Sequence, residues 1–215
     1  MTAEELKHHL VSISGESIPL PGRGETPKRH RRLMDVGRED LGLARLAEAH
    51  WDAVAILAEA GQKSEPGVLY GVWAEIPGQA LSLQRDAMSY RLHGMKKFCS
   101  GAGLIARALV TVGVPTHQLV EVNLCDEEAE IEVDHSPWQV DAFRSTQTST
   151  VTFNGLRVSP DAFVGGPGWY LERPGFWHGA YSPAACWAGG MAGLLDHALL
   201  SKRGDSHTAA HLGAM

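Results

Sequence analysis

Two histidines near the end of the chain have a spacing that would let one helix face present both to a metal ion. His207 and His211 are four residues apart, so their side chains would project from the same face of a helix. Apart from Asp205, no neighbouring residue has a suitable spacing for a third ligand. We therefore expect no metal site in this segment.

A basic cluster is the second group of side chains that could do chemistry. It comprises five consecutive residues, Lys28-Arg29-His30-Arg31-Arg32. Such a run forms either a solvated face at the start of a helix or a phosphate-binding patch, and we favour the solvated face. The whole chain has 19 basic and 25 acidic side chains, a net charge of -6, which argues against nucleic acid as its main partner.

Glycines and cysteines exclude several other classes of site. The glycines at positions 101 and 103, and at 165, 166 and 168, do not join a strand to a helix as a Rossmann fingerprint does, and there is no P-loop. Cys99, Cys125 and Cys186 form no CxxC pair, which favours a reducing, cytoplasmic location. The first residues, MTAEELKHH, lack the apolar core of a signal peptide, and no apolar run is long enough to span a membrane.

The elements that would position a site fall into three zones, and the first, residues 1–65, is predicted to be helical. Pro27 can open one helix that ends near Gly37, Asp40 can cap the next, and Gly61 can end it. Within the second helix, apolar residues recur at helical spacing on one face that also carries His50. We expect His50 to be a half-buried histidine with satisfied hydrogen bonds, not a ligand.

The second zone, residues 66–165, is predicted to be β-structure. Turn signals at Pro77-Gly78, 114–116, 125–126 and Asn154-Gly155 separate short segments that are rich in strand-forming residues. Many short strands with regular turns are typical of an antiparallel barrel or sandwich. The predicted strands are Val68–Ile76, Met88–Leu92, Ala108–Val114, Leu119–Cys125, Glu130–Val133 and Ser149–Val158.

The third zone, residues 166–215, is predicted to be the start of a helical bundle, which makes the fold class α+β. After a linker at 164–174, a helix is expected from Gly179 to Lys202, with small residues at 185, 189 and 193 where another helix can approach closely. Asp205 or Ser206 can cap a further helix, and the chain ends about two turns into it. We expect a fragment or an abbreviated homologue, the alternative being a terminal helix that docks on the body.

Three stretches, in order along the chain, resemble motifs of one known family. The segment 70–75, followed by Pro77-Gly78, resembles a strand that ends in threonine-glutamate-proline. The segment 92–102, LHGMKKFCSGA, resembles an asparagine-glycine-x-lysine-x-tryptophan-isoleucine-threonine motif. The segment 151–158, with the glycines at 165–168, resembles a last β-strand and the loop that leads to C-terminal helices, and 37–41 resembles a helix-connecting turn. The family with these motifs is the acyl-CoA dehydrogenase superfamily, and the resemblance covers nearly the whole chain.

The resemblance implies that FAD binds between the β-domain and the C-terminal helices. The flavin ring would lie against Trp73-Ala74 and Phe98-Cys99-Ser100, where aromatic walls and hydrogen-bond donors suit a flat, amphipathic ring. Arg203 is the nearest match to the arginine that holds the FAD pyrophosphate, although a cation at a helix C-terminus fits it equally well. Plain core packing is the alternative for the aromatic residues and Cys99, and a turn serine for Ser100.

Two departures affect the expected chemistry. Ala74 replaces a threonine that hydrogen-bonds the flavin, and the loop at 77–82 loses the family's glycine-serine character, which leaves the substrate class open. The family's carboxylate base would fall beyond Met215 or near Gly179, which has no side chain.

His178 and Glu172 are the nearest candidates for the base. A histidine at a helix entry is more often structural, and a carboxylate before a linker proline is more often solvated. No base is therefore assigned, and we expect the isolated chain to lack full dehydrogenase activity.

The resemblance therefore predicts an FAD-dependent oxidoreductase acting on CH–CH groups of an acyl-CoA-like small molecule. One alternative keeps the fold and changes the reaction to flavin-dependent monooxygenation, which needs no carboxylate base. A second alternative is a non-catalytic remnant of the flavin fold. Self-association into a homo-oligomer is possible, and no membrane span or nucleic-acid partner is expected.

Overall fold

The N-terminal zone forms three helices in the computed structural model, which describes residues 1–75, 81–113, 117–126, 131–200 and 205–214. They are α1 (Ala3–Ser14), α2 (Thr26–Glu39) and α3 (Leu41–Glu59). Thr2 and Glu5 form a capping box on α1, and the Asp40 carboxylate accepts a 2.8 Å hydrogen bond from the Leu43 N–H at the start of α3. The predicted Asp40 cap is therefore confirmed.

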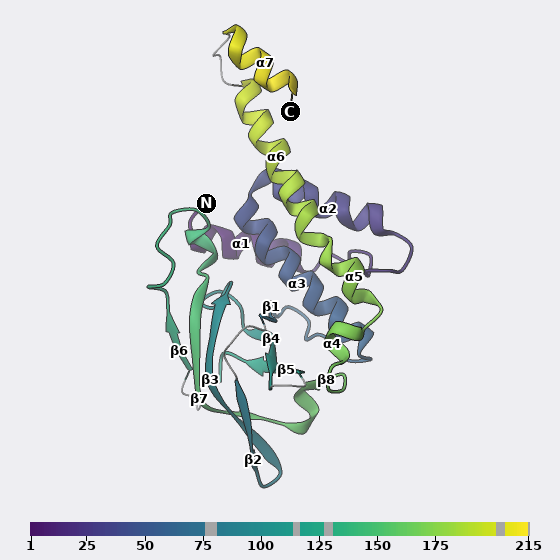
Figure 1. Cartoon of the computed structure of the whole chain (residues 1–215), viewed down its shortest axis with the longest axis vertical. Coiled ribbons are helices and arrows are strands. Elements are labelled where there is room, and N and C mark those ends of the chain that lie inside the picture. Colours follow the sequence, from purple (N-terminus) through teal and green to yellow (C-terminus); the bar gives the residue numbers. More distant parts are fainter. Residues whose placement is uncertain (76–80, 114–116, 127–130, 201–204, 215) are drawn as a thin grey trace.

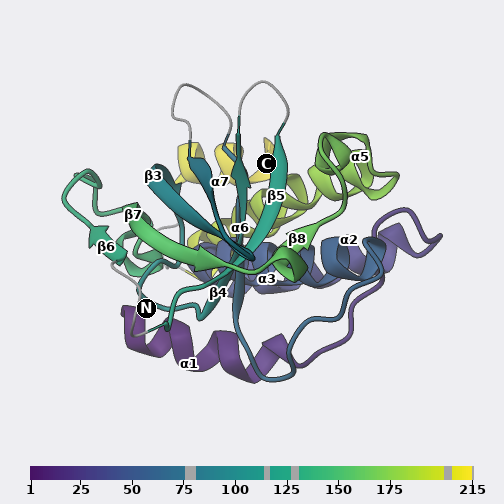
Figure 2. The same cartoon turned by 90° about the horizontal axis from the view of Figure 1, so that it is seen from below.

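The described strands form two four-stranded sheets and no closed barrel. The first sheet has the order β1 (Tyr70–Trp73), β4 (Arg107–Val112), β5 (Gln118–Asn123) and β8 (Phe163–Val164). The second has the order β2 (Ser82–Asp86), β3 (Ser89–Cys99), β7 (Ser149–Val158) and β6 (Ile131–Asp134). The sheets occupy one end of the molecule and α2, α3 and α6 the other (Figure 1). Figure 2, viewed from the sheet end, has the strands in front of α3.

The predicted antiparallel pairing needs one correction, since β1 pairs with β4 in parallel register. Between these two strands the chain builds the β2–β3 hairpin of the other sheet, and this crossover is what makes parallel pairing possible. Strands β2 and β8 were not predicted, because β2 is largely exposed and β8 has only two residues. The predicted ends at Ile76, Val114, Glu130 and Lys202, and the turns at 77–78 and 114–116, lie outside the described residues.

The predicted turn at Asn154-Gly155 is wrong, because β7 runs through both residues. His93 pairs with Asn154 and Leu92 pairs with Leu156, so Gly155 is an extra residue in the ladder. Its φ of 94° is open to glycine and strained for other residues. The Asn154-Gly155 pair thus correctly indicated a left-handed backbone, but this backbone forms a β-bulge and not a turn.

The C-terminal zone begins with two short helices, α4 (Trp169–Glu172) and α5 (Gly175–Ala180), and continues in the long α6 (Ser182–Leu200). The single predicted helix is thus interrupted at Tyr181, just before Pro183. Helix α6 crosses α2, and its far half, followed by α7 (Ser206–Ala214), extends beyond the body (Figure 1). Asp205 accepts hydrogen bonds from the N–H groups of His207 and Thr208, which confirms the predicted cap of α7.

Small residues allow α6 and α2 to touch at backbone distance. A Cβ atom on Gly189 would collide with the carbonyl of Met34, one on Gly193 with that of Arg38, and one on Gly37 with that of Cys186. The predicted role of the small-residue stripe as a helix-packing surface is confirmed. Among the described helices, none combines the length and the apolar character needed to cross a bilayer.

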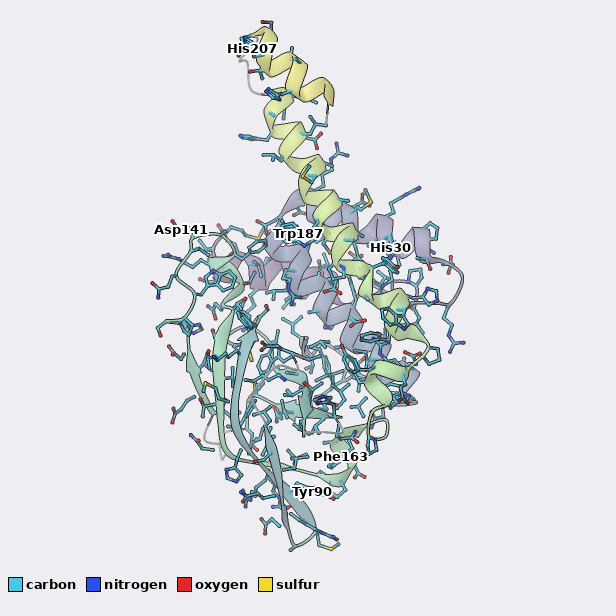
Figure 3. The ribbon with its side chains drawn as sticks, in the orientation of Figure 1. His30, Tyr90, Asp141, Phe163, Trp187 and His207 are labelled. Atoms are coloured by element: carbon cyan, nitrogen blue, oxygen red, sulfur yellow. The ribbon has the colours of Figure 1, made fainter. Side chains whose placement is uncertain are left out.

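Two hydrophobic clusters lie within the described residues, and both join helices and strands. The larger includes Leu6, Leu33 and Leu46 from the helices and Leu92 and Phe153 from the strands. His50 connects the layers, because it contacts the Ser14 carbonyl at 3.2 Å and accepts a 3.2 Å hydrogen bond from the Tyr70 N–H. The prediction that His50 has satisfied hydrogen bonds is confirmed, but the side chain is fully buried, at 4% exposure, and not half-buried, because helix and sheet close over it. At the sheet end of the molecule, Tyr90 of β3 and Phe163 of β8 meet edge to face, with their ring centroids 5.1 Å apart (Figure 3). The two residues belong to different sheets, so this contact joins them.

The interpretation of the basic cluster as a solvated face is wrong for one of its members. Lys28 and Arg31 are exposed, but Arg29 is 1% exposed. Its guanidinium donates to the Ser182 hydroxyl at 3.3 Å and to the Pro19 carbonyl at 3.2 Å, and so ties α2 to the start of α6. The helical period places one residue of this run on the core side, where its charge needs partners.

Replacement of Gly189 by alanine should destabilise the protein. The added methyl has no room against the Met34 carbonyl, so a loss of about 1–3 kcal/mol in unfolding free energy is expected from overpacking. Urea denaturation followed by circular dichroism measures it. Gly15→Ala is the matched control, since a Cβ there meets nothing within 4 Å. Equal stability of the two variants would contradict the close α2–α6 contact.

Candidate functional site

A pocket of about 270 Å³ lies where α3, α6 and the end of β3 meet. Four aromatic side chains line it, together with hydroxyl groups and one Arg–Glu pair. Two of them, Trp187 on α6 and Phe143 from the loop before β7, meet edge to face with their ring centroids 5.8 Å apart. Trp187 is labelled in Figure 3. The lining residues are Leu41, Arg45, Glu48, Phe98, Ser100, Trp138, Phe143, Thr146, Thr148, Pro183, Cys186 and Trp187.

Phe98 reaches the pocket through an irregularity in β3. The register with β7 shifts between Lys96 and Cys99, and Phe98 has a left-handed φ of 56°. A bulge of this kind re-aims a side chain, and strained backbone in a non-glycine residue is often retained at functional sites. The Phe98 ring is 62% exposed. The strand therefore presents an aromatic face to the pocket that packing of the core does not require.

Backbone strain gathers around this pocket. Among the described residues other than glycine, Ala87, Phe98, Phe143 and Gln147 have positive φ. Ala87 lies in the β2–β3 hairpin, whereas Phe98 and Phe143 line the pocket. Gln147 lines an adjoining, more open hollow of about 870 Å³ that shares Trp138, Phe143 and Thr148 with the pocket. Three of the four strained residues thus surround one site.

A chain of hydroxyl groups forms another part of the lining. The Thr148 hydroxyl donates to Ser100 Oγ at 3.0 Å and lies 2.9 Å from the Thr146 hydroxyl. Because Ser100 accepts this bond, its own O–H can donate to a ligand in the pocket. Behind it, the indole N–H of Trp73 donates to the Ser100 carbonyl at 3.1 Å. The serine is held from both sides.

The two segments predicted to flank a flavin do lie together. The Trp73–Ser100 hydrogen bond joins them once. The ammonium group of Lys96 joins them again, since it donates to the Glu75 carbonyl and, at 2.8 Å, to the Thr111 hydroxyl. Burial lowers the pKa of Lys96, and these oxygen acceptors keep a buried ammonium group satisfied.

The predicted cofactor-binding residues have different surroundings. Phe98 and Ser100 line the pocket, whereas Trp73 (3% exposed) and Cys99 (0%) lie in the core. Burial raises the pKa of the Cys99 thiol to about 12, as expected for a packing residue. Ala74 is half-buried beside Glu75, and Arg203 lies outside the described residues.

The two candidate bases are not brought to the pocket. Glu172 on α4 and His178 on α5 are exposed, and neither belongs to the lining. The imidazole of His178 lies next to Gly22, in the loop before α2.

The pocket contains a carboxyl group that the sequence did not indicate. Glu48 on α3 is 7% exposed and lines the cavity, with Arg45 Nη1 at 3.4 Å from its Oε2 atom. Burial, reinforced by the neighbouring Asp52 carboxylate, raises the pKa of Glu48 to about 7, against the opposing effect of Arg45 and Arg29. A carboxyl with such a pKa can take up or release a proton near neutrality.

Buried charges on α3 continue away from the pocket. Burial also raises the pKa of Asp52, while Arg173 and Arg29 act against this change. Arg173 is 3% exposed, lies 3.6 Å from Asp52 and donates a 2.8 Å hydrogen bond to Glu59. This pairing docks the segment after β8 onto α3 and so sets where α5 and α6 begin.

Glu48 should make protein stability fall as pH rises. Its pKa is near 4.5 when unfolded and about 7 when folded, so its neutral form is favoured by folding, and that stabilisation is lost between these values. In the wild type, ionisation of Glu48 should lower the unfolding free energy by on the order of 3 kcal/mol between about pH 5 and pH 8. This decrease should be absent in Glu48→Gln, whose side chain cannot ionise. Urea denaturation at several pH values measures it. If the difference in unfolding free energy between the wild type and Glu48→Gln does not change with pH, the expected burial penalty is contradicted.

Comparison with known proteins gives matches in structure alone. No protein-family model and no curated protein matches the chain at the level of sequence. The structure resembles FMN-bound TdsC from Paenibacillus sp. A11-2, with a TM-score of 0.73 and 17% identity over 99% of this chain and 70% of that one. TdsC is named as a dibenzothiophene monooxygenase, and another of its structures contains FMN and indole.

Two further structures are similar. Butyryl-CoA dehydrogenase from Megasphaera elsdenii has a TM-score of 0.71 and 14% identity over 98% of this chain and 66% of that one. KijD3, in complex with FMN and a dTDP-linked sugar, has a TM-score of 0.72 and 15% identity over 99% of this chain and 61% of that one. The chain thus spans about two thirds of the length of these proteins, and it has the fold of the acyl-CoA dehydrogenases.

Proposed function

We propose that this chain binds a flavin whose ring lies against Phe98 and Ser100, and that it acts as part of a flavin-dependent oxidoreductase. The observation that carries this proposal is Phe98, an aromatic side chain held out of the core by a strained bulge at the rim of an aromatic pocket. An exposed ring and an adjacent hydroxyl suit a planar ligand with a polar edge. The fold shared with FMN-bound TdsC and with butyryl-CoA dehydrogenase supports it.

The residues that would hold the flavin have distinct tasks. Phe98 would contact the ring face, the Ser100 hydroxyl would donate to its polar edge, and Trp73 would fix the Ser100 backbone. A bound flavin accepts a hydride or, once reduced, activates oxygen. FAD is the flavin that the sequence resemblance implies, whereas the TdsC and KijD3 structures contain FMN, so both flavins belong in the binding test.

The pocket favours monooxygenation of a small aromatic compound. Its volume of about 270 Å³ lies just below the usual range of ligand pockets, roughly 300–1,000 Å³, and suits one small ring system. Trp138, Phe143 and Trp187 would surround such a ring together with Phe98. A second candidate function is dehydrogenation of an acyl thioester, and Glu48 favours it, since a carboxyl in the pocket could serve as the base.

Loss of the Phe98 ring should weaken flavin binding and leave the fold intact. Phe98→Asn suits the test, because asparagine tolerates a positive φ. The affinity for FMN or FAD should fall roughly tenfold, as expected for the loss of an aromatic contact and its buried area. Quenching of flavin fluorescence measures the affinity. Met88→Ala, at an 87% exposed position in the β2–β3 hairpin, is the control, and protein that stays colourless after incubation with either flavin supports a non-catalytic remnant.

Anaerobic reduction of the flavin-loaded protein distinguishes the two reactions. We expect the yellow absorbance to persist with butyryl-CoA and to bleach with NADH and an external flavin reductase. When oxygen and indole are then admitted, the protein should consume indole, because a small ring fits the aromatic pocket. Chromatography measures the loss of indole. Rapid bleaching by the acyl-CoA, lost in Glu48→Gln, would instead establish the dehydrogenase.

A further inference from the structure

We propose that Glu48 accepts the O–H or N–H proton of a ring-shaped molecule bound in the pocket. It would act as a hydrogen-bond acceptor for either donor and, for the more acidic phenol O–H, also as the base that removes the proton. The ligand class is therefore phenol-like or indole-like: a small aromatic ring with one donor group. This inference rests on the proposed function only in taking the aromatic pocket as a binding site for such a ring.

The position of Glu48 makes it accessible to a ligand. Leu41, Arg45 and Glu48 follow at spacings of four and three residues, so they lie along one face of α3, and all three line the pocket. In the part of the chain that the structure describes, Arg45 is the hydrogen-bond partner of Glu48 and contacts one carboxylate oxygen, Oε2, at 3.4 Å. The other oxygen is available to a donor in the pocket.

The surroundings of Glu48 explain why a donor would be held tightly. A carboxylate among aromatic side chains has lost most of its hydration, and its ion-pair partner Arg45, at 3.4 Å, is half exposed, so that solvent weakens the pair. A ligand O–H or N–H would restore a hydrogen bond to it, and such charge-assisted bonds are about twice as strong as neutral ones. A ring of the same shape without a donor would leave the carboxylate unsatisfied.

The proton transfer is balanced within the pocket. In a phenol-like ligand the O–H bond breaks, its electron pair stays on the ligand oxygen, and the proton forms an O–H bond with Glu48, whereas an indole-like N–H is only held by its hydrogen bond. The resulting ring anion is richer in electrons, and Arg45, which lines the same cavity, would offset its negative charge.

Several charged or titratable groups face Glu48, and they determine the pH at which it can accept a proton. The pKa of Glu48 is raised to about 7 by burial and by Asp52, so the carboxylate form predominates above neutrality. Burial raises the pKa of both Cys186 and Tyr170 to about 12, so these two groups stay neutral across the range tested. The charged groups are Arg45 and Asp52 on α3 and Arg29 on α2.

Binding of a matched pair of ligands tests the proposal. Calorimetric titration of the whole chain with phenol and with anisole compares rings that differ in the donor group. The preference for phenol should rise roughly tenfold between about pH 6 and pH 8.5, since phenol itself stays protonated there. Repeating the titration in two buffers of different ionisation enthalpy should detect a proton balance that depends on Glu48.

Variants assign the effect to this side chain. Glu48→Gln should keep anisole binding and lose the pH-dependent preference for phenol, whereas Glu172→Gln, at an exposed position on α4, should behave as the wild type. A preference that is independent of pH in the wild type, or that persists in Glu48→Gln, overturns the proposal. Absence of phenol binding at every pH overturns it as well. The wild-type measurement stands even if Glu48→Gln does not fold.

The proposed function and this inference can fail separately. A protein that binds phenol with the expected pH dependence but takes up neither flavin would keep the role of Glu48 and refute the flavin site. A yellow, reducible protein without the pH-dependent preference would keep the flavin site and refute the role of Glu48.

Discussion

The approach of α6 to α2 at backbone distance is the constraint on which the rest of the structure depends. Gly37, Gly189 and Gly193 leave no space for side chains between the two helices. With α6 in this place, Cys186 and Trp187 close the cavity over the end of β3. Arg29 then reaches Ser182, and Glu48 becomes buried. The closure of the pocket and the burial of Glu48, which raises its pKa, both depend on this close helix contact.

The sheets contribute the opposite wall, and they do so through irregular pairing. A regular β3 strand would direct Phe98 along the alternating pattern of its neighbours, and the bulge instead sends this ring to the cavity. The cost of this strain is offset by anchors on either side, since Trp73 holds the Ser100 carbonyl and Lys96 holds the end of β1. A rigid frame thus carries a small strained segment, which is the arrangement expected where a ligand must be positioned precisely.

Charge burial separates the pocket from the structural part of the same helix. Glu48 faces the cavity and pairs with the half-exposed Arg45, whereas Asp52 and Glu59, further along α3, contact the buried Arg173. A paired carboxylate stabilises the docking of the segment after β8, and a poorly paired one is left available for proton transfer. Glu48 and Asp52, which have these different roles, are one helical turn apart.

Local properties of the sequence determined the elements: the caps at Asp40 and Asp205, most of the strands, the satisfied His50 and the small-residue face of α6. Each depends on neighbours in the chain, and so does the motif around Phe98 and Ser100. Tertiary structure alone decided that Arg29 is buried, that Asn154-Gly155 is a bulge, that β1 pairs in parallel with β4, and that Glu48 lines the pocket. These features arise where segments far apart in the chain exclude water together, and no local pattern records which segments will meet.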